Sequence, residues 1–207
     1  MKIAFSRIAW GLGLALIDIT INGFDLLPDV VGYGLLMAGL AKLVSRNRMY
    51  KLAWNAAAVQ LVLSVLALLG LTRSGFSLTG GIEPSLNALA LTAAGLAIEL
   101  AMLYGLCEGI RLDALERNKE RLAQSARNRR HFAFASGAGM LFQLPFQLNQ
   151  SLQEMLPFVI VLALCVLFAW LSILALARQA GREIAGNPGS GGGGLDGGEG
   201  SLMDVRV

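Results

Sequence analysis

The sequence predicts an all-α membrane protein, a polytopic bundle of six transmembrane helices with both termini in the cytoplasm. Hydrophobic residues make up 55% of the 207-residue chain and charged residues only 15%, whereas a typical soluble domain has about 25% charged residues. The hydrophobic residues form blocks close to the roughly 20 residues that a helix needs to cross a bilayer. Basic residues gather in alternate connections between these blocks, which fixes the predicted orientation.

Six hydrophobic segments are the predicted transmembrane helices. They are residues 3–22, 30–44, 52–71, 86–110, 132–147 and 156–177. The third, fourth and sixth have the length and composition of full membrane spans. The second and fifth are short, so either could instead be a tilted or re-entrant element. These segments form one domain over residues 1–185, followed by a glycine-rich tail over 186–207 that we expect to be disordered and cytoplasmic.

The first segment is expected to remain in the chain, although its basic start and apolar run mimic a secretory signal peptide. Asp18 interrupts the apolar run, and no small-residue cleavage site follows before residue 22. The chain then turns within a few residues. Asp25 can cap the next helix, and Pro28 fits the first turn of that helix, where no amide partner is needed. We therefore expect a tight hairpin between the first two membrane helices.

The basic residues set the predicted orientation. With six crossings and the N-terminus inside, every one of the 17 lysines and arginines except Arg73 falls on the inner side, as the positive-inside rule requires. An even number of crossings is needed to keep the basic groups of residues 111–130 and 178–182 on the same side. Because these residues lie between membrane segments, they indicate topology and not nucleic-acid binding.

The longest inner connection, Arg111–His131, has helical character. Leucines recur at helical spacing, and Asp113 and Arg117 have the i,i+4 spacing of an intrahelical ion pair. Glu108, three residues before Arg111, is expected to pair with it. Two interpretations of this connection stay open. It is either a solvated connector that holds orientation, or a surface for anionic lipid or a protein partner, where each basic group near such lipid contributes about 1 kcal/mol.

Two carboxylates, Asp18 and Glu99, form the candidate intramembrane polar site. A charged group at a helix centre costs about 2.5–3.5 kcal/mol on insertion scales, and the neighbours of Glu99 are all alanine, isoleucine or leucine. The predicted partners on other segments are Asn55, Gln60 and Gln143. A bond to one of them would hold helices together. The alternative is a site for protons or cations on a transport path.

Catalytic and cofactor signatures are not found in the sequence. His131 is the single histidine, so no Ser-His-Asp set and no histidine-based metal centre can be assembled. Cys107 and Cys165 both lie in apolar stretches, where they are expected to be packing groups. The glycine-rich tail does not match a phosphate-binding loop. We therefore expect no enzymatic activity, no cofactor and no metal.

The turn between the first two segments carries a resemblance. The stretch Ile21–Tyr33, INGFDLLPDVVGY, followed by GLAKL at Gly39–Leu43, resembles a group of uncharacterised multi-pass membrane proteins of Gram-positive bacteria. The resemblance implies a location in the bacterial cytoplasmic membrane and brings no activity with it. Its hallmark residues in this chain are Asp25, Pro28, Asp29, Gly32 and Tyr33.

The sequence thus favours a non-enzymatic structural or partner-binding membrane component. The alternative is a small transporter or channel, coupled to protons or cations, that uses the intramembrane carboxylates. A unit of this size would have to oligomerise to form such a path.

Overall fold

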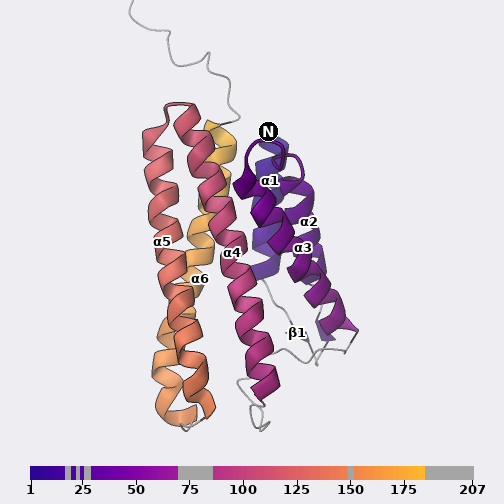
Figure 1. Ribbon diagram of the computed structural model, residues 1–207, viewed down its shortest axis with the longest axis vertical. Coiled ribbons are helices and arrows are strands. Elements are labelled where there is room, and N and C mark those ends of the chain that lie inside the picture. Colours follow the sequence, from indigo (N-terminus) through magenta and orange to yellow (C-terminus); the bar gives the residue numbers. More distant parts are fainter. Residues whose placement is uncertain (17–19, 22–23, 26–28, 70–85, 149–151, 185–207) are drawn as a thin grey trace, which may run out of the picture.

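The protein is all-α (Figure 1). The computed structural model describes residues 1–16, 20–21, 24–25, 29–69, 86–148 and 152–184. The helices are α1 (Lys2–Leu16), α2 (Asp29–Leu40), α3 (Arg48–Leu68), α4 (Leu86–Glu116), α5 (Glu120–Gln143), the 3₁₀ helix η1 (Leu144–Leu148) and α6 (Leu152–Glu183). Two short strands, β1 (Thr20–Ile21) and β2 (Phe24–Asp25), pair antiparallel.

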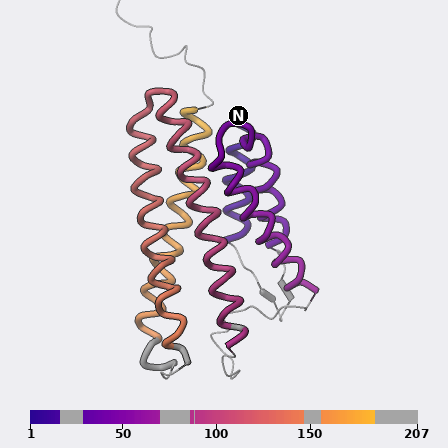
Figure 2. The backbone as a smooth tube through the Cα atoms, in the orientation of Figure 1, coloured from indigo at the N-terminus to yellow at the C-terminus, as the bar shows by residue number. Residues whose placement is uncertain are grey.

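The six α-helices form a closed bundle. Each helix packs against the next one in the chain, and α1 packs against α6 to close the ring. Figures 1 and 2 show α4 between the α1–α3 half and the α5–α6 half, and α4 also contacts α6. Long stretches of three helices are apolar enough to cross a membrane. They are Arg48–Leu68, Leu89–Glu116 and Leu156–Glu183.

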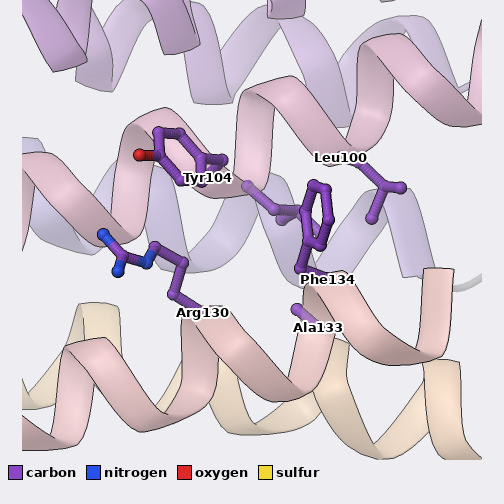
Figure 3. A pocket seen from close by; sticks show the side chains of 6 residues that line it. Leu100, Tyr104, Arg130, Ala133 and Phe134 are labelled. Carbon is purple, nitrogen blue, oxygen red and sulfur yellow. The ribbon is translucent and has the colours of Figure 1, made fainter. Parts of the chain in front are cut away.

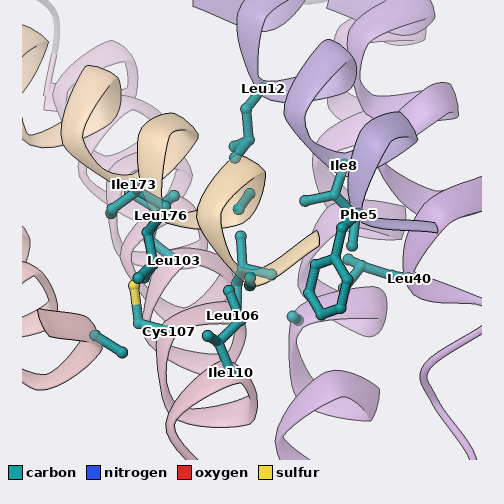
Figure 4. Packing of buried hydrophobic residues seen from close by; sticks show 14 of the residues in the cluster. Phe5, Ile8, Leu12, Leu40, Leu103, Leu106, Cys107, Ile110, Ile173 and Leu176 are labelled. Carbon is teal, nitrogen blue, oxygen red and sulfur yellow. The ribbon is translucent and has the colours of Figure 1, made fainter. Parts of the chain in front are cut away.

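The core lies where α1, α4 and α6 meet (Figure 4). Phe5, Ile8 and Leu12 recur at three- and four-residue spacing along α1, so one face of this helix points inward and is fully buried. Ile110 of α4 and Ile173 of α6 are equally buried. The outer surface is also apolar, with large side chains exposed along α3 and α6, as expected for helices surrounded by lipid.

Glycines bring α1 and α2 into backbone contact. A Cβ atom at Gly39 would lie 2.7 Å from Cγ1 of Ile8 and 2.8 Å from the carbonyl oxygen of Ala4. One at Gly11 would lie 2.6 Å from the amide nitrogen of Leu36. Small residues allow such close approach, which gives membrane helices their dispersion contacts.

The first two predicted helices are longer than the observed ones. Residues 3–22 were expected to be helical, but α1 ends at Leu16 and Thr20–Ile21 is a strand that pairs with Phe24–Asp25. The prediction is therefore wrong at these two β-branched residues, which favour extended backbone. α2 ends at Leu40 and not at residue 44, and the chain continues in hydrogen-bonded turns.

The later helices extend further than their apolar segments. α3 begins at Arg48, where Oδ1 of the N-cap Asn47 accepts from the amides of Met49 and Tyr50 at 3.0 and 3.1 Å. α4 continues to Glu116, α5 begins at Glu120 instead of residue 132, and α6 covers 152–183 instead of 156–177. Hydropathy marks only the apolar part of a helix, whereas arginine, glutamate and glutamine continue it into water.

The predicted inner connection is therefore a helical hairpin, formed by the last turns of α4, the turn at residues 117–119 and the first turns of α5. Asn118 has a φ of 55°, a left-handed conformation that asparagine adopts more readily than most residues. The amide of Lys119 bonds to the carbonyl oxygen of Ala114 at 2.9 Å, which closes the C-terminus of α4.

One end of the bundle carries the basic residues. The start of α1, the turn between α2 and α3, the α4–α5 turn and the end of α6 lie at the same end (Figures 1 and 2). In the part of the chain that the structure describes, the lysines and arginines all lie within residues 2–7, 42–51, 111–130 and 178–182, which include these segments and the helix turns that flank them. Arg73, Arg206 and the tail at 186–207 lie outside the described residues.

Candidate functional site

Glu99 is bound to a tryptophan on another helix. Its Oε1 accepts a hydrogen bond of 2.6 Å from Nε1 of Trp170, which joins the middle of α4 to α6. Trp170 is buried, with 6% of its surface exposed. The carboxyl group is therefore satisfied by an indole N–H, a donor that pairs readily when buried.

In the described part of the chain, none of the three amide side chains predicted as partners bonds to Glu99. Gln60 instead donates a 2.8 Å bond to the carbonyl oxygen of Gly95. Gln143 is 2% exposed, and neither its Oε1 nor its Nε2 has a partner in the described part of the chain. The search among amides missed Trp170. The signal available was an indole at similar depth in a long apolar segment.

The hallmark turn residues fall into different roles. Asp25 lies in β2 opposite Thr20. Asp29 is the first residue of α2, and Gly32 packs on α1, where a Cβ would lie 2.7 Å from the amide nitrogen of Ala15. Asp18 and Pro28 lie outside the described residues, so Asp18 cannot be placed relative to Glu99.

Tyr33, the last hallmark residue, is buried on α2, with 7% of its surface exposed. Both Tyr33 and Asp29 lie within electrostatic range of Glu99. Direct contact at Glu99 is shown only with Trp170, between α4 and α6. The sequence predicts Glu99 in the intramembrane site and Asp29 and Tyr33 in the turn motif, and it assigns Trp170 to neither.

A second polar cluster joins α4 to α5 nearer the basic end. The predicted pair of Glu108 and Arg111 is confirmed, with Nη1 of Arg111 2.6 Å from Oε1. Arg130 of α5 binds the other oxygen, Oε2. The Arg130 guanidinium also lies 5.1 Å from the ring centroid of Tyr104, a cation–π distance. Two arginines therefore hold one buried carboxylate, and an aromatic ring lies against one of the two.

Asp113 belongs to a third cluster, between α4 and α3. It is 1% exposed and accepts from the Tyr50 hydroxyl at 3.2 Å and from Nη1 of Arg46 at 3.4 Å. Asn47 completes the contact with an Nδ2 to Oδ1 distance of 3.5 Å. The predicted intrahelical pair with Arg117 is wrong, because the side chain of Asp113 is turned toward α3.

An open groove lies on the α4–α5 hairpin, beyond the Glu108 cluster. Its volume is about 460 Å³. Its lining residues are Arg111, Leu115, Glu120, Arg121, Ala123, Gln124 and Arg127. Three arginines face one glutamate, so the groove is positive. We name it the basic groove.

A narrow gap, too small to admit a water molecule, lies between the same two helices on the other side of the Glu108 cluster, with Tyr104 and Phe134 exposed beside it. It is lined by Leu100, Leu103, Tyr104, Arg130, Ala133 and Phe134. Figure 3 shows Arg130 of α5 reaching toward Tyr104 of α4, with Phe134 and Leu100 further along. We name it the aromatic cleft.

These arrangements differ in what they can do chemically. The Glu99 and Asp113 clusters are closed contacts between helices, whereas the basic groove is open and can hold an anion by charge and hydrogen bonds. No family model, curated protein or solved structure matches the chain.

Proposed function

We propose that this protein is a non-enzymatic component of the bacterial cytoplasmic membrane that binds an acidic partner through its α4–α5 hairpin. In this proposal the chain crosses the membrane six times and both termini are cytoplasmic. The observation that carries the proposal is the basic groove, where arginines line an open volume at the end of the bundle that carries the basic residues.

The internal contacts support a scaffold that holds this groove in place. The Glu108 carboxylate binds one arginine from each of the two helices that form the groove. Nη1 of Arg129 donates a 2.6 Å bond to the carbonyl oxygen of Ser172, which fixes α5 to α6. The groove is therefore held by rigid helices, which place binding groups more precisely than loops do.

The six crossings are supported by the ring of helices. α3, α4 and α6 are long enough, and α1, α2 and α5 complete the ring beside them. The 12 residues of α2 extend only about 18 Å, less than the roughly 30 Å of hydrocarbon. Its flanking segments would complete that crossing.

Site-specific photo-crosslinking tests the proposal. A photoreactive amino acid replaces Gln124, an exposed residue of the basic groove, in the otherwise native chain in cells. The double variant Arg121→Gln/Arg127→Gln should lose the adducts. The matched double variant Arg48→Gln/Arg178→Gln, which removes the same charge from exposed inner positions outside the groove, should keep them. Equal adducts in all three chains would refute partner binding at this hairpin.

A second candidate function is transport, favoured by the Glu99 cluster. An ionisable residue inside a bundle of membrane helices, such as Glu99 bonded to Trp170, is a feature typical of proton and ion paths. Proteoliposomes should be tested for flux of protons, sodium and potassium, with wild type beside Glu99→Gln. Flux that the variant abolishes would favour transport, whereas no flux under any gradient would favour the scaffold.

A further inference from the structure

We propose that the basic groove and the aromatic cleft together bind one anionic phospholipid. The phosphate would lie among Arg111, Arg121 and Arg127, and an acyl chain would run along Tyr104 and Phe134. This inference rests on the proposed function, because it names the chemical class of the acidic partner. Three independent features of the described residues support it.

The first feature is depth. Glu108 and Arg130 pair across the two helices, so they lie at one level. On α5 the apolar stretch begins at Phe132, directly after this level, which places the hydrocarbon boundary there. Arg111 lies three residues beyond Glu108 and Arg127 three residues before Arg130, a rise of about 4.5 Å on each helix, and the headgroup layer on each side of a bilayer is about 5–7 Å thick. The part of the basic groove that contains Arg111 and Arg127 therefore lies at the depth of lipid phosphates.

The second feature is continuity. On α4 the residues Tyr104, Arg111 and Leu115 follow at seven- and four-residue steps, and on α5 Phe134, Arg130 and Arg127 follow at steps of four and three. Residues at these spacings share one helix face. The aromatic cleft and the basic groove are thus successive parts of one seam between two helices. An amphipathic ligand can contact both parts of such a seam, whereas a soluble acidic peptide would bind only in the basic groove.

The third feature is charge. Arg121 and Arg127 are exposed, and neither has a side-chain partner recorded in the described part of the chain. Arg111 is held by Glu108 through Nη1, which leaves its other guanidinium donors to a phosphate. Arginine presents a planar fork that matches phosphate oxygens. Basic pockets between membrane helices on the cytoplasmic side bind anionic headgroups in this way.

The test is lipid binding by the full-length protein in neutral detergent, measured by native mass spectrometry. The probes are dioleoylphosphatidylglycerol, dioleoylphosphatidylcholine, and inorganic phosphate as a competitor without acyl chains. Wild type should bind phosphatidylglycerol more tightly than phosphatidylcholine, and millimolar inorganic phosphate should not displace it. Each arginine removed should weaken phosphatidylglycerol binding about fivefold, and Arg121→Gln/Arg127→Gln about 25-fold.

The control double variant Arg48→Gln/Arg178→Gln should bind phosphatidylglycerol within about twofold of wild type, since surface charges outside the seam contribute little at short screening length. Equal losses in the two double variants would overturn the inference, because the effect would then be general surface charge. Displacement by inorganic phosphate would overturn it too, as the site would be one for free anions. Because Arg121 and Arg127 are exposed, the groove variant Arg121→Gln/Arg127→Gln should unfold at the same temperature as wild type. Equal unfolding temperatures would show that this variant is folded.

The lipid inference and the proposed function can fail separately. If the groove variant loses protein adducts at Gln124 but keeps its phosphatidylglycerol binding, the hairpin binds a protein and the lipid inference is wrong. If it keeps both, the lipid inference and the proposed function are both wrong. If the variant loses both its phosphatidylglycerol binding and its lipid adducts at Gln124, the lipid inference and the proposed function are both supported.

Discussion

Trp170 donates a 2.6 Å hydrogen bond from Nε1 to Oε1 of Glu99, between the middle of α6 and the middle of α4. These two helices make few other contacts compared with their neighbours in the ring. The bond therefore fixes the relative position of two helices across the bundle. It also explains how a carboxylic acid is accommodated among apolar residues, since a bonded polar group avoids most of the cost of burial.

Trp170→Phe should destabilise the protein by about 1–2 kcal/mol, because it leaves Glu99 buried without its donor. Glu99→Gln keeps an acceptor oxygen for the indole and should cost less than Trp170→Phe. Unfolding in mixed detergent micelles measures both changes. Trp10→Phe, at a position that is 61% exposed, serves as the control and should have little effect. A loss for Trp10→Phe as large as that for Trp170→Phe would contradict this role for the bond.

Asp113 is expected to be the costliest polar residue to remove at the basic end. Asp113→Leu takes the acceptor from the Tyr50 hydroxyl, which is fully buried, and should cost about 2–4 kcal/mol. Asp113→Asn keeps one carbonyl oxygen and should cost less. The same unfolding measurement applies, with the exposed Glu116→Gln expected within about 0.5 kcal/mol of wild type. Equal stability of Asp113→Leu and wild type would contradict the assignment.

These two bonds also show what the sequence could and could not predict. Apolar blocks predicted the number of helices, and i,i+3 spacing predicted the pair of Glu108 and Arg111, because both signals are local. The partner of Glu99 depends on which helices meet, and single-sequence periodicity does not contain that information. Asp113 was assigned to Arg117 for the same reason, as only packing against α3 reveals Tyr50 and Arg46.

The observed ends of the helices could not be predicted from hydropathy alone. Hydropathy located the apolar parts of α4 and α5 but ended them at the basic residues. Arginine and glutamate are good helix formers, so both helices continue and create the basic groove. The sequence predicted only a basic connection here. It could not predict the shape of the groove, because that shape arises where the chain reverses at Asn118 and α5 packs against α4.

Gly39→Ala should destabilise the protein, whereas Gly34→Ala should not. Both replacements favour the helix by about 0.5–1 kcal/mol, but only Gly39 faces α1, where a Cβ would lie 2.7 Å from Cγ1 of Ile8. Overpacking of this kind costs about 1–3 kcal/mol. Gly34 has no atom within 4 Å of an added Cβ. Melting temperatures in one detergent should therefore fall for Gly39→Ala and stay level or rise for Gly34→Ala, and a rise in both would contradict the α1–α2 packing.

The native cysteines make the proposed topology testable by labelling. Cys107 is buried and Cys165 is partly buried within α6, so a membrane-impermeant maleimide should react little with the wild-type chain. Any new reactivity then comes from an added cysteine. Four single cysteines, at residues 45, 77, 124 and 151, report on the crossings by α3, α4 and the α5–η1 segment.

Ser45→Cys and Gln124→Cys should be labelled only in inverted vesicles, and Ser77→Cys and Ser151→Cys only in intact cells with the outer face accessible. We expect this pattern because only 15% of the residues are charged, and the lysines and arginines among them orient the chain according to the positive-inside rule. The pair Gln124 and Ser151 tests the topology most strictly. In the proposed topology the basic half of α5 lies outside the hydrocarbon, so only residues 132–148 remain to cross it. Seventeen residues are at the lower limit for a helical span, and the five in η1 rise more steeply than an α-helix. Labelling of both positions from the same side would show that the α5–η1 segment does not cross, and the six-helix topology would have to be abandoned.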